Sequence, residues 1–163
     1  MKRLWAPWRV EYILNADKAK GCILCDKPRE KHDAANYILF RGKLNFIILN
    51  AYPYSPGHLM IAPYRHIGNL IDLKSSEARE HVELVQLGIK LLSAVIKPAG
   101  FNIGMNIGRV AGAGIESHIH THVVPRWSGD NNFMSVIADT RVLSEGLSAM
   151  YAKLKRGLAD LKD

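Results

Sequence analysis

"SHIHTHVVPRW", residues 117–127, governs how the rest of the chain is interpreted, because it holds three of the seven histidines at alternate positions. In an extended strand, successive side chains point to opposite faces, so His118, His120 and His122 should project from one face about 7 Å apart. Each imidazole has two ring nitrogens that need partners, so burial alone does not account for such a row. We therefore expect a functional site on this strand.

Two kinds of site remain open from these residues alone. All three imidazoles could bind one metal ion, but same-face positions converge on one ion only if the strand bends. Alternatively, one imidazole is a nucleophile while its neighbours orient it and protonate the leaving group. The preceding stretch, Gly108 to Gly114, is a glycine-rich loop whose backbone N–H groups could cradle phosphate oxygens. Together with the net charge of +7, which attracts anions, this loop favours phosphoryl or nucleotidyl transfer.

The length and composition are those of a soluble globular protein with one core. The 163 residues contain no run of about 18 apolar residues that could span a bilayer. Pro7, Arg9 and Glu11 interrupt the apolar character of the N-terminus, so it does not resemble a secretory signal and we expect a cytoplasmic protein. No zinc-finger array or dense Lys/Arg tract indicates nucleic-acid binding. We therefore expect neither a membrane nor a nucleic acid as partner.

Hydrophobic periodicity predicts an α+β fold with a mostly antiparallel sheet of about five strands, one long helix packed on it and a C-terminal helix. Short apolar runs between turn residues give the strands, at 36–40, 44–50, 58–63, 101–107 and 118–125. The long helix should begin at Ser75, which can cap it, and stop before Pro98. Its expected core stripe comprises Val82, Val85, Ile89, Leu92 and Ile96.

No internal repeat or linker divides the chain, so we expect a single domain over residues 1–163. Its parts are an N-terminal extension at 1–21, a core at about 22–135 and a helical C-terminal segment at about 136–163, with the helix itself at about 141–161. The extension carries large aromatic groups that must pack against the domain or a second subunit, namely Trp5, Trp8 and Tyr12. The stretch 26–35, "DKPREKHDAA", is polar, and no element is predicted there.

The stretch "HIHTHVVPRW" resembles the histidine-triad (HIT) superfamily, whose motif is His-x-His-x-His followed by two apolar residues. Upstream, "LNFIILNAYPYSPGHLMIAP" is similar to the family's strand, proline-glycine turn and Gly-His pair, and the resemblance spans roughly residues 22 to 135. The pieces "LWAPWR", "LNAYPYSPGHLM" and "HVVPRWSGDNNF" are most similar to the prokaryotic branch of diadenosine tetraphosphate phosphorylases and HIT hydrolases. The resemblance implies a HIT-like fold and a homodimer whose sheets are joined.

The resemblance also implies roles for individual residues. His120 would be the nucleophile that attacks the α-phosphorus, His122 a phosphate-binding group or proton donor, and His118 a support for the site. Asn50 would hold the ribose and His58 would buttress the triad. From its position alone, the Asn50 amide could equally bond the backbone of the following turn.

Phosphate contacts are implied for the loop before the triad, at Asn106, Gly112 and Gly114. This chain has Gly112-Ala113-Gly114 where the branch usually has Gly-Gly-Ser. The change removes a hydroxyl that would contact phosphate, and it weakens the case for phosphorolysis.

Cys22 and Cys25, the two cysteines of the chain, are too close together for a disulfide that staples the fold. From their spacing alone, metal binding, redox chemistry and plain packing stay open. The resemblance implies a structural zinc held by Cys22, Cys25, His66 and His118, and no organic cofactor.

The resemblance implies an enzyme that splits a dinucleoside polyphosphate through a nucleotidyl-histidine, with phosphate or water as the acceptor. An adenosine phosphoramidase would use the same intermediate, and a non-catalytic nucleotide-sensing or interaction protein could keep the pocket. Hexose-1-phosphate uridylyltransferase activity is disfavoured, because those relatives have glutamine in place of His122. DNA-adenylate repair is disfavoured because no C-terminal zinc finger follows.

Three further polar residues complete the expectations. Arg126 should pair with phosphate, with an acidic side chain of a second subunit, or in an exposed structural ion pair. His32 and His81 belong to no motif and are expected at the surface.

Overall fold

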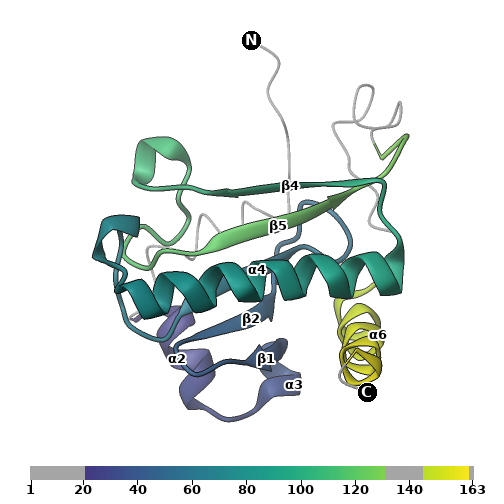
Figure 1. The fold of residues 1–163 in the computed structure, drawn as a ribbon, viewed down its shortest axis with the longest axis horizontal. Coiled ribbons are helices and arrows are strands. Elements are labelled where there is room, and N and C mark those ends of the chain that lie inside the picture. The colour runs from purple at the N-terminus through teal and green to yellow at the C-terminus, as the bar shows by residue number, and fades with distance from the viewer. Residues whose placement is uncertain (1–20, 131–144, 162–163) are drawn as a thin grey trace.

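A five-stranded sheet forms the centre of the computed structural model, which describes residues 21–130 and 145–161. Its strands are β1 (Ile38–Arg41), β2 (Asn45–Leu49), β3 (Leu59–Pro63), β4 (Gly100–Met105) and β5 (Thr121–Arg126). They lie in the order β1-β2-β3-β5-β4, and every neighbouring pair is antiparallel (Figure 1). The predicted α+β class and the antiparallel sheet of about five strands are confirmed.

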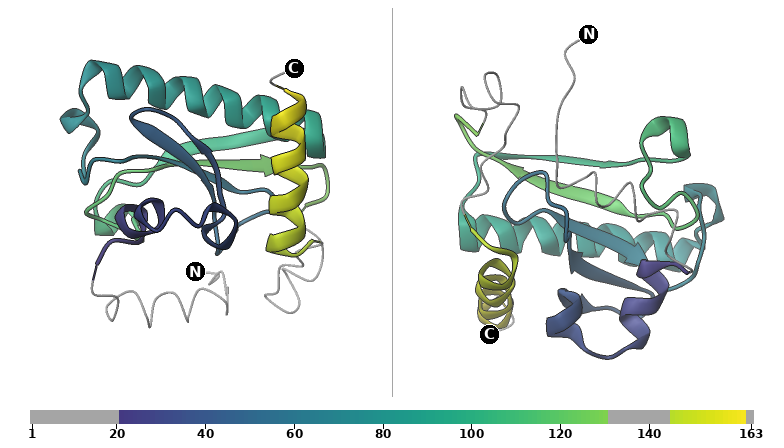
Figure 2. Two further views of the ribbon diagram at one scale, coloured as in Figure 1. Left: turned by 90° about the horizontal axis from the view of Figure 1, so that it is seen from below. Right: turned by 180° about the vertical axis from the view of Figure 1, so that it is seen from behind.

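Helices cover both faces of this sheet. The helices are α2 (Ile23–Arg29), α3 (Asp33–Asn36), α4 (Ser75–Ile96) and α6 (Leu147–Asp160), with single 3₁₀ turns η1 (Leu70–Asp72) and η2 (Arg109–Ala111). Helix α4 packs on β2, β3 and β5, and α6 packs on α4 and β1. Figure 2 shows α4 on one face and α2 on the other. Among the helices in the described ranges, none is long and apolar enough to cross a bilayer.

Side-chain alternation in the central strands separates two apolar clusters. In β2, Ile47 and Leu49 face α4, whereas Phe46 and Ile48 lie in the cluster that includes Leu24 of α2. All residues of β2 and β3 are buried, because both faces of these strands are covered. Both faces of these central strands are therefore buried, and the face away from α4 also carries the site.

Helix α4 begins at Ser75, as predicted, but its cap and core stripe differ from the expectation. Lys74 is the N-cap residue, and its backbone N–H donates to the Glu77 carboxylate at 2.8 Å. Val82 was expected in the core but is 56% exposed. The buried positions are Glu77, His81, Leu84, Gly88, Leu91 and Leu92. The expected stripe was wrong near the helix start, because apolar periodicity cannot reveal polar residues that face inward.

His81 is one of these inward residues, so its expected surface location is wrong. Its Nδ1 donates to Oδ1 of Asn45 at 2.9 Å, and its Nε2 accepts from the Thr121 hydroxyl at 2.6 Å. The amide nitrogen of Asn45 donates to Glu80 at 3.1 Å, which assigns the amide oxygen to His81. Burial, with a smaller effect of His120, lowers the pKa of His81 to about 4. His81 is thus a neutral polar residue of the core.

Two short helices occupy the N-terminal stretch for which no element was predicted. Helix α2 buries only Leu24 and Pro28, and α3 buries only Asn36. Segments of seven and four residues are too short for apolar periodicity to distinguish a helix from a loop. The expectations for the extension at residues 1–20 lie outside the described residues. The C-terminal helix was expected from about residue 141, but α6 begins at Leu147, and the described residues before it, Glu145 and Gly146, are not helical.

Candidate functional site

The three histidines of the triad stretch do not share one strand. Strand β5 begins at Thr121, and His118 and His120 lie in the segment before it. The predicted strand start at residue 118 is therefore wrong. The neighbouring strand β3 ends at Pro63, which has no N–H to donate to a strand. The carbonyl of Pro63 accepts a hydrogen bond from the His118 ring and not from the backbone of a neighbouring strand.

His118 points toward the two cysteines. Its side chain is fully buried, and its Nε2 donates to the Pro63 carbonyl at 2.8 Å. The proton on Nε2 leaves Nδ1 with its lone pair, 3.3 Å from Sγ of Cys22 and 3.4 Å from Sγ of Cys25. Burial lowers the pKa of His118, which favours this neutral form.

His120 has the opposite tautomer. Its Nδ1 donates to the backbone carbonyl of His118 at 2.8 Å, so Nε2 keeps the lone pair. Burial lowers the pKa of His120, and the hydrogen bond to the carbonyl partly opposes this effect. A buried neutral imidazole with a lone pair at Nε2 is chemically a nucleophile.

A chain of hydrogen bonds orients His122. The backbone N–H of Tyr54 donates to Nδ1 of His58 at 3.1 Å, so a neutral His58 ring carries its proton on Nε2. That Nε2 donates to Nδ1 of His122 at 2.9 Å. The proton of a neutral His122 is therefore on Nε2, where it can serve as a hydrogen-bond donor.

A cavity of about 240 Å³ opens beside His120 and His122. Its apolar wall comes from α2, β2, β3 and the loop before β5, and the residues of this wall include Ile23, Ile48, Leu49, Met60 and Ile115. Of the residues predicted for the site, His120, His122, Asn50, Gly112 and Gly114 line it. An apolar cavity with a nucleophile and a hydrogen-bond donor on its wall suits a nucleoside with its phosphate at the histidines.

The remaining predicted residues lie around this cavity. His58 is fully buried and bonds His122, and His118 is not among the lining residues but holds His120 through its backbone carbonyl. Asn106 lines a second cavity, of about 330 Å³, which also includes His122. The side chain of Asn106 donates to the carbonyl of Gly112 at 3.3 Å.

Asn50 follows β2 and makes the local turn bond that its position allowed. Its Oδ1 accepts from the backbone N–H of Tyr52 at 2.9 Å, which is a local turn bond. Its Nδ2 lies 3.3 Å from Nδ1 of His58, and the residue lines the cavity. The amide is therefore fixed in the turn, and the residue lies at the cavity wall.

The glycine-rich loop is shaped by two positive backbone angles, φ +84° at Gly108 and +88° at Gly112. Only glycine adopts such angles without strain. The N–H groups of Ala111, Gly112 and Ala113 donate to carbonyls within the loop. These three groups are therefore engaged, and the expected phosphate cradle is not made by them in this conformation.

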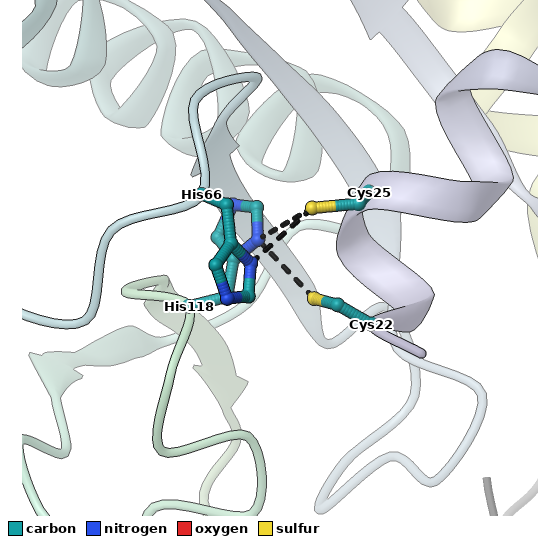
Figure 3. Close-up of side chains that lie close together, drawn as sticks. All are labelled: Cys22, Cys25, His66 and His118. Carbon is teal, nitrogen blue, oxygen red and sulfur yellow. Dashed lines mark hydrogen bonds between the residues drawn. The ribbon is translucent and has the colours of Figure 1, made fainter. Parts of the chain in front are cut away.

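Cys22, Cys25, His66 and His118 come together on the α2 side of the sheet. Figure 3 shows the two thiols at the start of α2 facing both imidazoles, and the four ligand atoms lie within 4.8 Å of one another. The sulfur of Cys25 lies 3.3 Å from Nδ1 of His66. A tetrahedral zinc ion with Zn–S of about 2.3 Å separates neighbouring S and N ligand atoms by roughly 3.5 Å.

The three S–N distances of 3.3 to 3.4 Å are close to this separation, so the cluster could hold one metal ion. Burial and the neighbouring Cys22 raise the pKa of Cys25 to about 11. Two adjacent thiolates need a cation to hold them, and metal binding provides one. The Pro63 carbonyl that fixes the His118 tautomer supports the same chemistry.

The sequence did not identify the contribution of α2 to the cavity. Ile23 and Lys27 line it from this helix, between and just after the two cysteines. Burial lowers the pKa of Lys27, so its ammonium is partly removed from water. The spacing of Cys22 and Cys25 was the one sequence signal for this contribution. A metal site at the start of a helix would also fix the position of the residues next to its ligands.

Arg126 follows the triad and forms an ion pair within its own chain. Its Nε and Nη2 donate to the two carboxylate oxygens of Asp130 at 2.5 and 2.9 Å. Its Nη1 donates to Oδ1 of Asn102 at 2.8 Å. Among the described residues, the acidic partner of Arg126 is therefore Asp130 of the same chain, in a structural ion pair.

Known proteins resemble this chain in both sequence and structure. The HIT domain family model matches residues 31–129. AP-4-A phosphorylase of Mycobacterium tuberculosis is 38% identical over 152 residues, which cover 89% of this chain and 78% of that protein. The asymmetrical bis(5'-nucleosyl)-tetraphosphatase of Schizosaccharomyces pombe is 28% identical over 122 residues, or 74% of this chain and 66% of the relative.

Solved structures support the same fold. A histidine triad nucleotide-binding protein of Sulfolobus tokodaii aligns with a TM-score of 0.71 and 24% identity, covering 86% of this chain and 94% of that one. A zinc-bound histidine triad family protein of Mycobacterium smegmatis aligns with a TM-score of 0.70 and 24% identity, covering 87% and 96%. At this identity the likeness establishes the fold.

Proposed function

The chain belongs to the HIT domain family, and from this premise we propose that it is an enzyme that cleaves dinucleoside polyphosphates of the diadenosine tetraphosphate type at the α-phosphate. The observation that carries the proposal is the neutral His120 on the wall of the cavity, with its Nδ1 held by a backbone carbonyl. The names of the M. tuberculosis and S. pombe relatives indicate the same substrate class.

In the first step, Nε2 of His120 attacks the α-phosphorus and a P–N bond forms. The bond from phosphorus to the bridging oxygen breaks, and the leaving nucleotide takes the electron pair as a phosphate oxyanion. The ring becomes positively charged while its Nδ1–H donates to the His118 carbonyl at 2.8 Å. This hydrogen bond stabilises the charged ring, so the carbonyl favours the nucleotidyl-histidine.

His122 would assist at the bridging oxygen. The chain from Tyr54 through His58 directs a proton to Nε2 of His122, as the hydrogen bonds require. A donor at this position stabilises negative charge as it develops on the leaving oxygen. His58 is therefore proposed as a positioning residue, because it acts through His122.

The nucleoside would occupy the first cavity. Ile48, Met60 and Ile115 offer apolar surface to a base, and Asn50 lies where it can bond a ribose hydroxyl. Gly112 and Gly114 would lie next to the α-phosphate, since they line the cavity without side chains.

In the second step, an acceptor oxygen attacks the α-phosphorus of the intermediate and the P–N bond returns its electron pair to Nε2. With inorganic phosphate as acceptor, diadenosine tetraphosphate gives ADP and ATP; with water it gives AMP and ATP. The M. tuberculosis relative is named a phosphorylase and the S. pombe relative a tetraphosphatase. Gly114 stands where a serine hydroxyl would contact phosphate in the phosphorylase branch, so both acceptors enter the test.

We propose that Cys22, Cys25, His66 and His118, here called the Cys22 cluster, hold a structural zinc. When bound, it would supply a closed tetrahedral cross-link and no open coordination position. The ligands on α2 would then keep Ile23 and Lys27 in the cavity wall. Reduced cysteine ligands suit a reducing compartment, so we place the reaction in the cytoplasm.

We also propose a homodimer joined through β4. This strand is at the edge of the sheet beside β5, and its Ile103 is 46% exposed. An edge strand with an exposed apolar side chain is a template for pairing with a second copy.

The proposal is tested by incubating the protein with diadenosine tetraphosphate, with and without inorganic phosphate, and identifying the products. ADP that forms only with phosphate supports phosphorolysis, and AMP with ATP supports hydrolysis. His120→Ala serves as the control for contaminating enzymes. If wild-type protein carrying its metal cleaves the dinucleotide under neither condition, the proposal is wrong.

A further inference from the structure

We propose that the second cavity is a subsite for the leaving group, which holds the polyphosphate chain of the departing nucleotide. The inference rests on the proposed function and adds to it a site on the far side of the catalytic histidines. The cavity measures about 330 Å³. Its lining residues used below are Tyr54, Asn102, Gly104, His122 and Arg126.

The two cavities meet at His122. Both His122 and Tyr54 line the first and the second cavity, whereas His120 lines the first alone. The ring centroids of His120 and His122 are 4.8 Å apart. A phosphate held at these two rings, with its nucleoside in the first cavity, therefore extends its next phosphates past His122 and into the second cavity.

The floor of the second cavity is a row on one face of β4. Asn102 pairs with Val124 and Gly104 with His122 across the antiparallel ladder. Directly paired residues project to the same face of a sheet, so Asn102 and Gly104 share the face of His122. A Cβ added at Gly104 would meet no atom within 4 Å. The sheet therefore leaves open space beside His122 where a longer residue would fill it.

The hydrogen-bond donors of this cavity are held in place. Arg126 donates to Oδ1 of Asn102 at 2.8 Å, which leaves the amide hydrogens of Asn102 as donors for another partner. Asp130 fixes the guanidinium through two hydrogen bonds. A guanidinium has five N–H donors, and these contacts use three of them.

Amide and guanidinium donors suit phosphate oxygens. Because Asp130 offsets the charge of Arg126, the cavity would recognise the polyphosphate through hydrogen bonds more than through net charge. AMP ends at a single phosphate and would reach only the first cavity. Diadenosine tetraphosphate continues beyond it, so the second cavity would contribute to binding of the dinucleotide alone.

The test is a matched pair of glycine substitutions on β4. Gly104→Val places a side chain in the open space of the second cavity. Gly100→Val is the control, since Gly100 lies on the same face four residues away and does not line the cavity. A Cβ at Gly100 also meets nothing within 4 Å, and neither glycine has a positive φ.

Binding of diadenosine tetraphosphate and of AMP is measured by calorimetry on the full chain carrying His120→Ala, which prevents turnover. The ratio of the two Kd values should rise about tenfold with Gly104→Val and should stay the same with Gly100→Val. Asn102→Ala should raise the ratio by roughly three- to tenfold, since it removes donors to a charged group. An equal ratio in the parent, Gly104→Val and Asn102→Ala proteins would overturn the subsite.

This outcome is separate from a failure of the proposed function. If Gly104→Val raises the Kd ratio as expected but the wild-type protein never cleaves the dinucleotide, the enzymatic proposal fails and the subsite stands. If the wild-type protein cleaves the dinucleotide while Gly104→Val and Asn102→Ala leave the Kd ratio unchanged, the subsite alone fails.

Discussion

A buried histidine network lies on each face of the sheet near the start of β5, and the two networks differ in how the ring nitrogens are used. On the α4 face, His81 has both ring nitrogens bonded to side chains, those of Asn45 and Thr121. On the cavity face, the described hydrogen bonds of His120 engage only Nδ1, through the His118 carbonyl. Burial lowers the pKa of both rings.

Burial and a depressed pKa therefore do not distinguish a structural histidine from a reactive one. The distinction comes from the second nitrogen. A ring bonded to protein at both nitrogens stabilises the fold, whereas a ring with one nitrogen at a cavity wall is available for chemistry. We expect substitutions on the two faces to separate activity from stability.

The largest effect should follow His120→Ala. Loss of the nucleophile should lower kcat for diadenosine tetraphosphate by roughly 10⁴-fold or more. The α4 network is untouched, so the thermal midpoint should stay close to that of the wild type. Steady-state kinetics and circular dichroism melting measure the two quantities. Retention of a tenth of the activity would contradict the assignment of His120.

Metal removal should have the next largest effect, because the Cys22 cluster anchors α2 to the triad segment. Cys22→Ser should lower zinc content, measured by atomic emission, and lower Tm by about 10 °C. KM should rise, since Ile23 and Lys27 line the cavity, and kcat should fall as well, because the carbonyl of the ligand His118 holds Nδ1 of His120. Wild-type stability in protein verified to lack metal would reject the structural role, and Ser75→Ala, at the exposed start of α4, is the control substitution.

A stability effect without loss of activity is expected for His81→Ala. The change leaves the Asn45 oxygen and the Thr121 hydroxyl without their partner in the core, so the free energy of unfolding should fall by about 3 kcal/mol. Urea denaturation measures it, with the exposed His32→Ala as a control that should change it by less than about 0.5 kcal/mol. A drop in kcat comparable to that of His120→Ala would contradict the division between the two faces.

The smallest effect concerns the pH dependence of stability. The pKa of His81 is about 4 in the folded protein, below its ordinary value of 6.5. Between these values the unfolded chain binds more protons, so stability is complete above pH 6.5 and declines as the pH falls toward 4. His81→Gln should make this decline shallower. Unfolding curves at several pH values, recorded at equal metal content, test it, and parallel profiles would show that His81 does not titrate in this way.

Long periodic segments made most of the fold predictable. Strands such as Asn45–Leu49 and the helix Ser75–Ile96 were expected near their observed bounds, because each repeats its pattern over a whole element. The start of β5 was not predictable, since it depends on the Pro63 carbonyl binding a histidine ring from a distant segment. Helices α2 and α3 were missed because they are too short to carry a period.

The candidate site was predictable only in part. The alternation of His118, His120 and His122 drew attention to the correct segment, but spacing could not show that His118 faces the thiols. The buried position of His81 depends on an Asn45 side chain 36 residues away, and a lone histidine on a helix carries no signal of it. The role of the second cavity depends on Gly104, which has no side chain that a motif could register.

The central claim is that the nucleotide passes through His120. The most direct measurement is to mix the protein with diadenosine tetraphosphate, quench in alkali to preserve the P–N bond, and map the modified peptide by mass spectrometry. The account predicts one adenylyl group on His120, none on His118, His122 or His81, and none in His120→Ala. Adenylyl transfer to another residue, or rapid turnover with no adduct at any time point, would contradict it.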